Sequence, residues 1–263
     1  MASYAIGFLI STLVVIVPIL VMANNRAVYI SLEGFVIVIG GTIGIAVSAF
    51  PFKRLVHTIK SVVTILKNEV DDGPVVVREI IELSQKTKGE RASLNKEVDS
   101  IRYPFLKDGV QLIIDRIDHK LEDILVDRIR TRQENGQSIV NIVKTLGKFP
   151  PALGLLATVL SLVTLLEGLG GSKSGMSSLG PSMAVGLVGT LYGIVLANLV
   201  FSPMAENLAV KSSLDTRNRQ ITMVGLLLLR DQESALVVQE SLNAMLEIHQ
   251  RVDVLGLDEK AAA

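Results

Sequence analysis

The carboxylates nearest to the long apolar stretches of this chain are Glu33 and Glu167, and a carboxylate is the group that an ion relay inside a membrane usually needs. Both are predicted to lie near the outer ends of apolar segments, where a carboxylate can reach water. Neither is expected at mid-membrane. If the chain handles protons or sodium, the working carboxylate must therefore come from another subunit.

Uncharged polar residues do occur deep in the apolar stretches. One row follows helical spacings of three and four: Pro151, Gly154, Thr158 and Ser161. A second row recurs at every fourth residue: Ser182, Gly186 and Thr190. Such rows of small residues allow helix backbones to approach closely in lipid. The structural interpretation of the two threonines is a hydroxyl bonded to the carbonyl four residues earlier, and it is favoured on these residues alone.

Other chemistries are not supported. With 0 Cys, the chain has neither a disulfide framework nor a thiolate zinc site, and its net charge of +0 gives no reason to expect nucleic acid. The GGSKSG run at 170–175 has Ser172 rather than Gly directly before Lys173, and no strand precedes it, so nucleotide binding is rejected. The histidines are scattered singly, and no nucleophile and base form a pair. The chain is therefore not expected to be an enzyme or to hold a cofactor.

The elements that position these residues are four uncharged blocks, at 1–25, 34–52, 149–166 and 174–205. About 20 apolar residues in a helix suffice to cross a bilayer core of roughly 30 Å. We predict membrane spans near 4–23, 29–50, 149–169 and 179–202, paired as two hairpins by short connections. The predicted fold class is all-α, a polytopic membrane protein with four transmembrane helices and a cytoplasmic helical domain.

Basic residues flank the spans on one side, while the opposite loops carry only Arg26 and Lys173. The positive-inside rule makes the charged side cytoplasmic, with both termini inside. The predicted domains are a first transmembrane hairpin, a cytoplasmic helical loop, a second transmembrane hairpin and a cytoplasmic helical tail, with these limits: 1–51, 52–148, 149–205 and 206–263.

The cytoplasmic part shows helical rather than strand-like patterning. A turn at 71–74 precedes a helix, because Pro74 suits the first helical turn. A longer amphipathic run begins near Pro104 and continues to Ile129, and the tail is predicted to form another helix over 235–252. Charged residues cluster between Lys86 and Asp99, where composition alone favours a solvated connector.

Three sequence runs carry a family resemblance: KFPPALGLLATVLSLVTLLEGLGG, LGPSMAVGLVGTLYGIVLANLVFSPMAENL and FLKDGVQLIIDRID. They resemble the A subunit of the flagellar stator, the MotA/PomA family. The resemblance implies a motor component of the bacterial inner membrane rather than an enzyme. It also implies five A subunits around a dimer of B subunits, each with one transmembrane helix, an ion-binding Asp and a peptidoglycan-binding domain. Ion flow would turn the A ring against the rotor protein FliG.

The resemblance also suggests roles for particular residues. Pro151 and Pro203 match the family's prolines beside the third and fourth spans and are assigned to conformational coupling. Thr158 and Thr190 match pore-facing positions, and a Thr at 158 resembles sodium-type stators. Hydroxyls and carbonyls are the hard donors that a dehydrating sodium ion needs, so sodium is slightly favoured over the proton as coupling ion. The ion-pathway candidates are Pro151, Gly154, Thr158, Ser161 and Thr190.

Departures from the family pattern leave other residues open. Lys148 replaces an acidic residue of sodium-type members, and Thr87 and Asn95 stand near an expected Arg and Glu. The candidates for rotor contact are Lys88, Arg91 and Glu97. An ExbB/TolQ-like or gliding-type motor is the close alternative, although the ExbB/TolQ group generally has three spans. A secondary transporter or a structural scaffold would be a different class of protein.

Overall fold

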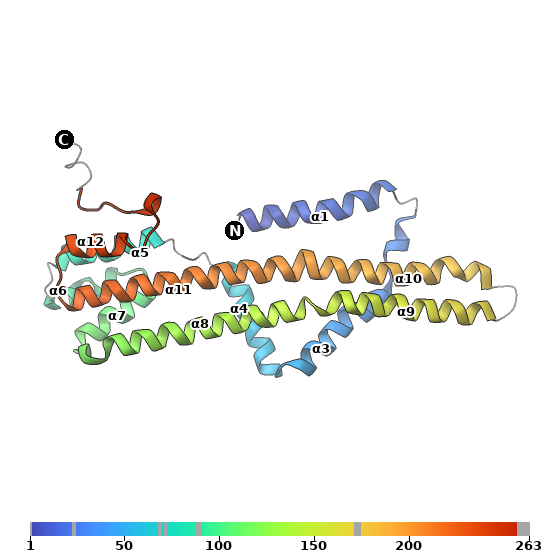
Figure 1. Cartoon of the computed structure of the whole chain (residues 1–263), viewed down its shortest axis with the longest axis horizontal. Coiled ribbons are helices and arrows are strands. Elements are labelled where there is room, and N and C mark those ends of the chain that lie inside the picture. Colours follow the sequence, from blue (N-terminus) through green and yellow to red (C-terminus); the bar gives the residue numbers. More distant parts are fainter. Residues whose placement is uncertain are drawn as a thin grey trace. The chain divides into compact units, whose positions relative to one another are not determined.

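The computed structural model describes residues 2–22, 25–67, 70, 73–87, 91–170 and 175–256, and these residues form helices and no strand (Figure 1). The first half contains α1 (Ala2–Met22), η1 (Arg26–Tyr29), α2 (Leu32–Phe35), η2 (Val36–Gly40), α3 (Gly41–Ala49), α4 (Phe52–Lys67), α5 (Gly73–Thr87), α6 (Arg91–Glu97), η3 (Val98–Ser100), α7 (Pro104–Ile114) and η4 (Asp118–Lys120). The second half contains α8 (Leu121–Leu146), α9 (Phe149–Gly170), α10 (Gly175–Val195), η5 (Leu196–Phe201), α11 (Ser202–Arg230), α12 (Ala235–Asn243) and η6 (Ile248–Gln250). The predicted all-helical class is confirmed.

The chain divides into two compact units. Unit 1 comprises residues 1–69 and 137–209, and unit 2 comprises residues 70–136 and 210–263. The limits fall within α8 and α11, so each of these helices contributes to both units.

Unit 1 contains the helices suited to a membrane. Among the described residues, three helical stretches are long and apolar enough to cross a bilayer: Arg26–Ala49, a part of Asp118–Gly168 and a part of Gly180–Arg230. Leu9–Val21 is a shorter apolar helix. Many large apolar side chains of these stretches are exposed, including Leu155, Val163 and Leu187 at 63%, 57% and 62%. Unpartnered apolar surface of this extent is typical of helices that face lipid or another subunit.

Two segments of unit 1 widen from α- to π-helix, η2 and η5. Pro203 follows η5 by two residues, in the first turn of α11. Proline has no N–H and its ring clashes with the carbonyl four residues earlier, so the regular ladder cannot continue through it. The π segment η5 therefore stands where Pro203 interrupts the ladder. We have no comparable local cause for η2.

Unit 2 is a helical bundle around one apolar core. Ile80 and Ile81 of α5, Leu106 of α7, Leu121 of α8 and Leu226 of α11 are all 0% exposed within it. Gly109 lets α7 approach Leu226, because a Cβ there would overlap that side chain. The amphipathic stripes expected from sequence thus provide the core of this unit.

The amphipathic run from Pro104 to Ile129 is two helices, not one. α7 ends at Ile114, where the N–H of Ile117 bonds the carbonyl of Leu112 at 3.1 Å and that of Arg116 bonds Ile113 at 3.1 Å. Arg116 has a φ of 59°, which completes a Schellman-type C-cap. Glycine usually occupies this position, so the residue types around Arg116 contain no stop signal.

The predicted tail helix over 235–252 is also wrong in its extent. α12 ends at Asn243, and the chain returns through η6 to an extended segment. The Asn243 side chain accepts a hydrogen bond from the N–H of Val252 and donates one to its carbonyl, both at 2.9 Å. Gln239, 2% exposed, accepts from the N–H of Val254 at 3.0 Å. Two buried amides therefore replace helical bonding for the last described residues.

Candidate ion-pathway site

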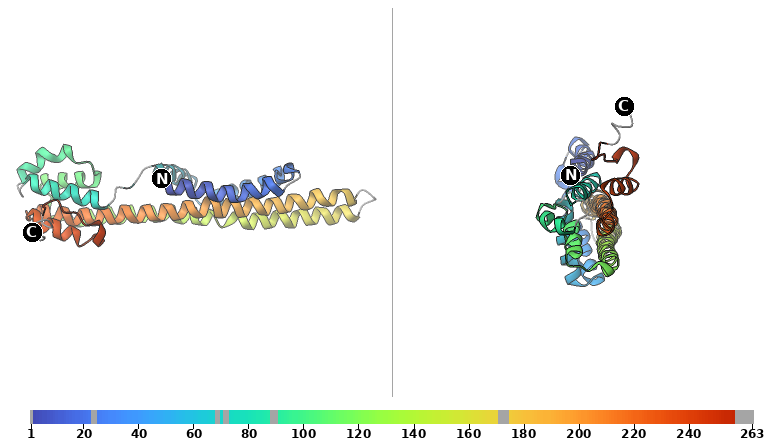
Figure 2. Two further views of the ribbon diagram at one scale, coloured as in Figure 1. Left: turned by 90° about the horizontal axis from the view of Figure 1, so that it is seen from above. Right: turned by 90° about the vertical axis from the view of Figure 1, so that its left-hand side faces the viewer.

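α9 and α10 lie side by side along their length in both orientations shown (Figure 1, Figure 2). Glycines set their separation. A Cβ on Gly154 would lie 2.8 Å from the Cα of Thr190, and one on Gly186 would lie 2.9 Å from the Cα of Thr158. Both distances are too short for real carbon atoms, so these backbones are as close as only glycine permits. The small-residue rows predicted from sequence do face each other here.

This close approach brings four oxygen atoms together. The hydroxyl oxygens of Thr158 and Thr190 are 2.6 Å apart. The Thr158 hydroxyl lies 3.2 Å from the carbonyl of Gly154 and 3.1 Å from that of Gly186. The Thr190 hydroxyl lies 3.0 Å from the carbonyl of Gly154 and 3.2 Å from that of Gly186. Each threonine thus contacts both its own helix and its neighbour, and we call these four atoms the oxygen cluster.

The oxygen cluster has more acceptors than donors. Two hydroxyl protons serve two carbonyls and two hydroxyl oxygens, so unused lone pairs remain. Oxygen atoms of this kind suit a hard cation. The set carries no formal charge, and Glu167, the one carboxylate in α9, lies nine residues from Thr158, roughly 13 Å along the helix. The oxygen cluster can line an ion path, but it lacks an anionic group.

The other ion-pathway candidates lie along the same helix pair. Ser161 is 8% exposed, and its Cβ would lie 3.0 Å from a Cβ on Gly186. Pro151 lies in the first turn of α9, where a missing N–H is tolerated. A Cβ on Gly193 would lie 3.1 Å from the Cα of Pro151. Pro203 belongs to α11, outside this helix pair.

Tyr192 is a residue that the sequence analysis did not single out. Its hydroxyl donates to the carbonyl of Tyr29 at 2.7 Å and accepts from the N–H of Ser31 at 3.1 Å. The Ser31 hydroxyl in turn caps α2 by accepting from the N–H of Gly34 at 3.0 Å, and it donates to the Glu33 carboxylate at 3.2 Å. Tyr192 therefore ties the start of α2 to α10, two residues from Thr190. Its place in the GTLYG run was the available signal.

Gly34 shows how close this contact is. A Cβ there would lie 3.2 Å from the Cα of Gly189. Glu33 itself is exposed, and Lys148 is exposed in the turn between α8 and α9. Neither side chain reaches the oxygen cluster through a described hydrogen bond.

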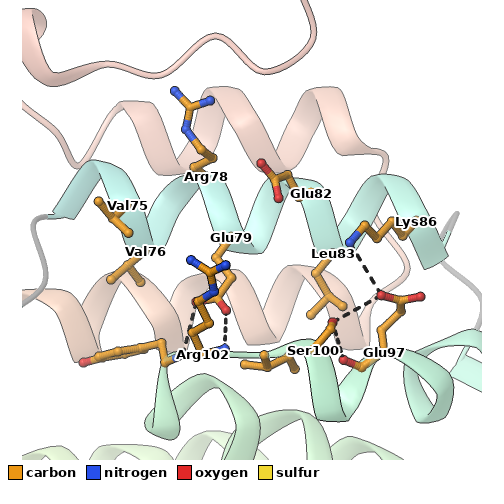
Figure 3. Close-up of a pocket in the computed structure, with 12 residues that line it drawn as sticks. Val75, Val76, Arg78, Glu79, Glu82, Leu83, Lys86, Glu97, Ser100 and Arg102 are labelled. Carbon is orange, nitrogen blue, oxygen red and sulfur yellow. Dashed lines mark hydrogen bonds and ion pairs between the residues drawn. The ribbon is translucent and has the colours of Figure 1, made fainter.

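The charged candidates lie in unit 2. Lys88 lies outside the described residues, and Arg91 is in the first turn of α6. Glu97 ends α6, where its carboxylate is 3.6 Å from the ammonium of Lys86 and accepts from the Ser100 hydroxyl at 3.2 Å. Figure 3 shows Lys86 and Glu97 directed toward each other across one end of a pocket.

That pocket has a volume of about 580 Å³ and lies between α5 and the segment 97–103. Glu79 fixes its floor by accepting hydrogen bonds from the backbone N–H groups of Arg102 and Tyr103 (Figure 3). The remaining charged side chains on its lining are Arg78, Glu82 and Arg102. Among the described residues no group of three His, Cys, Asp or Glu side chains could hold a metal ion.

The sequence of this chain is similar to those of known proteins. A family model described as the MotA/TolQ/ExbB proton channel family matches residues 97–221. The chain is 30% identical to the uncharacterized protein YtxD of Bacillus subtilis, over 90% of this chain and 89% of YtxD. It is 26% identical to the chemotaxis protein PomA of Vibrio alginolyticus, over 91% and 92% of the two chains.

A solved structure shares the fold. The flagellar MotAB stator complex from Bacillus subtilis contains a chain that matches with a TM-score of 0.83 at 21% identity, over 96% of this chain and 99% of that one. The shared fold, the matched relatives and the family model agree with one another. The chain therefore belongs to the MotA/TolQ/ExbB proton channel family, as a stator A subunit of the MotA/PomA type.

Proposed function

We propose that copies of this chain form a ring around a pair of B subunits with one transmembrane helix each. In this proposal α9 and α10 line the ion path, and the B subunits supply the ion-binding carboxylates. The oxygen cluster carries this proposal, because it offers hard oxygen donors in a membrane helix pair whose one carboxylate, Glu167, lies nine residues from Thr158. As a member of a channel family, the chain is a channel component and not an enzyme.

The proposed topology has four spans in a bacterial inner membrane, with both termini in the cytoplasm. α1 supplies the first span. Its 21 residues give a length of roughly 31 Å, enough to cross the bilayer core. Unit 2 then forms the cytoplasmic domain, together with the ends of α8 and α11 that lead into it. The domain limits at 51, 148 and 205 stay predictions within this proposal.

The proposed assembly has five copies of this chain around two B subunits, each with a peptidoglycan-binding domain that anchors it. This chain and the B subunit depend on each other for ion conduction because of charge. An ion moving past uncharged helix surfaces needs a counter-charge inside the membrane, and a B-subunit carboxylate provides one. Rotation of the ring would then be passed to the rotor protein FliG through charged residues of unit 2, with Lys88, Arg91 and Glu97 as candidates.

The coupling ion is proposed to be sodium rather than the proton. The oxygen cluster supports this choice, since hydroxyl and carbonyl oxygens can replace part of the hydration shell of sodium. Swimming speed measured while sodium is withdrawn at constant proton-motive force should fall with the sodium concentration. An unchanged speed would identify the proton as the coupling ion.

Reconstitution tests the division of labour between the two subunits. Proteoliposomes that contain this chain and a single-span partner with a mid-span Asp should conduct ions, and liposomes with the chain alone should not. Replacing the partner's Asp with Asn in the same preparation should abolish the flux. Conductance by this chain alone would contradict the proposal.

A further inference from the structure

α4 carries an exposed apolar stripe although it is not part of an apolar span. Phe52, Ile59 and Val63 are 68%, 64% and 46% exposed. Their spacings of seven and four place them on one face of the helix. We call these three residues the apolar stripe of α4, and no described side chain of unit 1 covers it.

The neighbouring face of α4 is packed against the rest of unit 1. Leu55 is 8% exposed and clusters with Ala46 and Ile142. Val62 is also 8% exposed and packs among residues of α8 and α11, including Val140 and Leu208. Leu55 and Val62 thus meet the same short stretch of α8, so α4 crosses that helix rather than following it, as Figure 1 shows. The orientation of the apolar stripe is therefore fixed by buried contacts.

A row of lysines borders the apolar stripe. Lys53, Lys60 and Lys67 recur at every seventh residue, each one position after a residue on or beside the stripe. All three are exposed, and none forms an ion pair with a described residue. The segment 52–67 contains no Asp or Glu, so nothing within α4 neutralises this lysine row.

The position of α4 indicates the environment of the apolar stripe and the lysine row. α3 ends at Ala49, at the end of the apolar stretch Arg26–Ala49, and α4 begins at Phe52 after Pro51. A helix that leaves the membrane and immediately turns across the bundle stays at the level of the lipid headgroups. There an apolar face can reach acyl chains while bordering lysines extend their ammonium groups to phosphates.

We propose that α4 lies in the bilayer interface and binds anionic phospholipid headgroups through its lysine row, with the apolar stripe inserted among the acyl chains. Charge selects the lipid, because three ammonium groups that pair with no described carboxylate favour an anionic surface over a zwitterionic one. The inference depends on Arg26–Ala49 crossing the membrane and not on motor function, so a failure of the motor proposal would leave it standing.

The absence of Trp from the chain allows a direct test. The full-length chain carrying Ile59→Trp is reconstituted in vesicles that contain brominated acyl chains on either phosphatidylglycerol or phosphatidylcholine, at equal mole fraction. Trp fluorescence should be quenched by both lipids, and at least about twofold more strongly by brominated phosphatidylglycerol, because each lysine favours the anionic lipid. Val63→Trp provides a second probe if the first variant is poorly folded.

The lysine row is tested in the same background. Lys53→Gln with Lys60→Gln should remove the preference for phosphatidylglycerol while leaving quenching by both lipids. The matched control is Lys96→Gln with Lys120→Gln, two exposed lysines of unit 2, which should keep the preference. Equal quenching by the two lipids with all lysines intact would overturn the proposal. So would the absence of quenching by either lipid, since the stripe would then be covered by protein, such as a second copy of this chain.

Discussion

At the scale of single residues, the two threonine hydroxyls of the oxygen cluster have a structural role that can be separated by mutation from the role proposed for them in the ion path. Each hydroxyl bonds the carbonyl four residues earlier in its own helix, which is a structural role. Each hydroxyl also bonds a carbonyl of the neighbouring helix, Gly186 for Thr158 and Gly154 for Thr190. Hydrogen bonds between membrane helices contribute only about 0.6 kcal/mol on average. The hydroxyls therefore contribute little to the pairing of α9 and α10, and their proposed role is to contact the ion.

Thr158→Val should separate these roles, because it removes the hydroxyl and nearly keeps the shape. We expect motility to fall at least about tenfold, since an interaction between a polar group and a charge contributes about 1.5–3 kcal/mol. The melting temperature should change little. Swimming in a strain without a second stator, with membrane content measured by immunoblot, checks this. Thr164→Val is the control, because that exposed hydroxyl bonds only the carbonyl of Ser161. Equal swimming by both variants would remove Thr158 from the ion path.

Tyr192→Phe should loosen the start of α2. It deletes the hydroxyl that bonds Tyr29 and Ser31, and each lost hydrogen bond costs about 0.5–1.5 kcal/mol. Hydrogen exchange at residues 26–31 should accelerate, while exchange in α9 and α10 stays the same. Tyr29→Phe, which keeps the backbone carbonyl that Tyr192 uses, should leave exchange unaltered. Unchanged exchange in Tyr192→Phe would show that packing alone holds the segment.

At the scale of elements, glycine decides how closely α9 and α10 pair. Gly154→Ala places a Cβ 2.8 Å from the Cα of Thr190, so the two backbones must separate. We expect a cost of about 1–3 kcal/mol and a lower melting temperature in detergent, together with loss of motility. Gly44→Ala is the matched control, since a Cβ there meets nothing within 4 Å, and alanine is the better helix former. A melting temperature for Gly154→Ala as high as for Gly44→Ala would refute the close pairing.

At the scale of the whole molecule, the proposal that unit 2 passes force to a rotor can be tested at Glu97. Glu97 is held by Lys86 at 3.6 Å, and a partly exposed pair of this kind contributes about 0–1 kcal/mol to stability. Glu97→Lys should therefore leave the melting temperature nearly unchanged. Torque should fall if the rotor contacts the Glu97 carboxylate. Torque is measured from the rotation of beads attached to flagellar stubs.

A charge swap distinguishes rotor contact from a local structural role. Glu97→Lys combined with Lys86→Glu restores the ion pair with reversed polarity. If Glu97 contacts the rotor, torque stays low in the double variant, because the charge facing the rotor is still reversed. Full recovery of torque would mean that Glu97 only supports its own helix.

Features that repeat along one helix follow from the amino-acid sequence: the apolar helices, the helical core stripes of unit 2 and the small-residue rows. Residue spacing alone was therefore enough to place Gly154, Thr158, Gly186 and Thr190 in those rows. The ends of α7 and α12 could not be predicted, because neither is marked by glycine or proline. α7 ends just before Arg116, whose backbone is in the left-handed conformation, and α12 ends where the buried amides of Gln239 and Asn243 bond the returning chain.

Which atoms meet depends instead on the packing of separate helices. The four-oxygen geometry, the Tyr192 bridge across 161 residues and the pairing of Glu97 with Lys86 all join different elements, and periodicity does not specify such contacts. The same holds for α4, whose composition alone did not tell a buried face from an exposed one. A hydrophobic pattern records that a face avoids water, whereas the fold determines whether protein or lipid covers it.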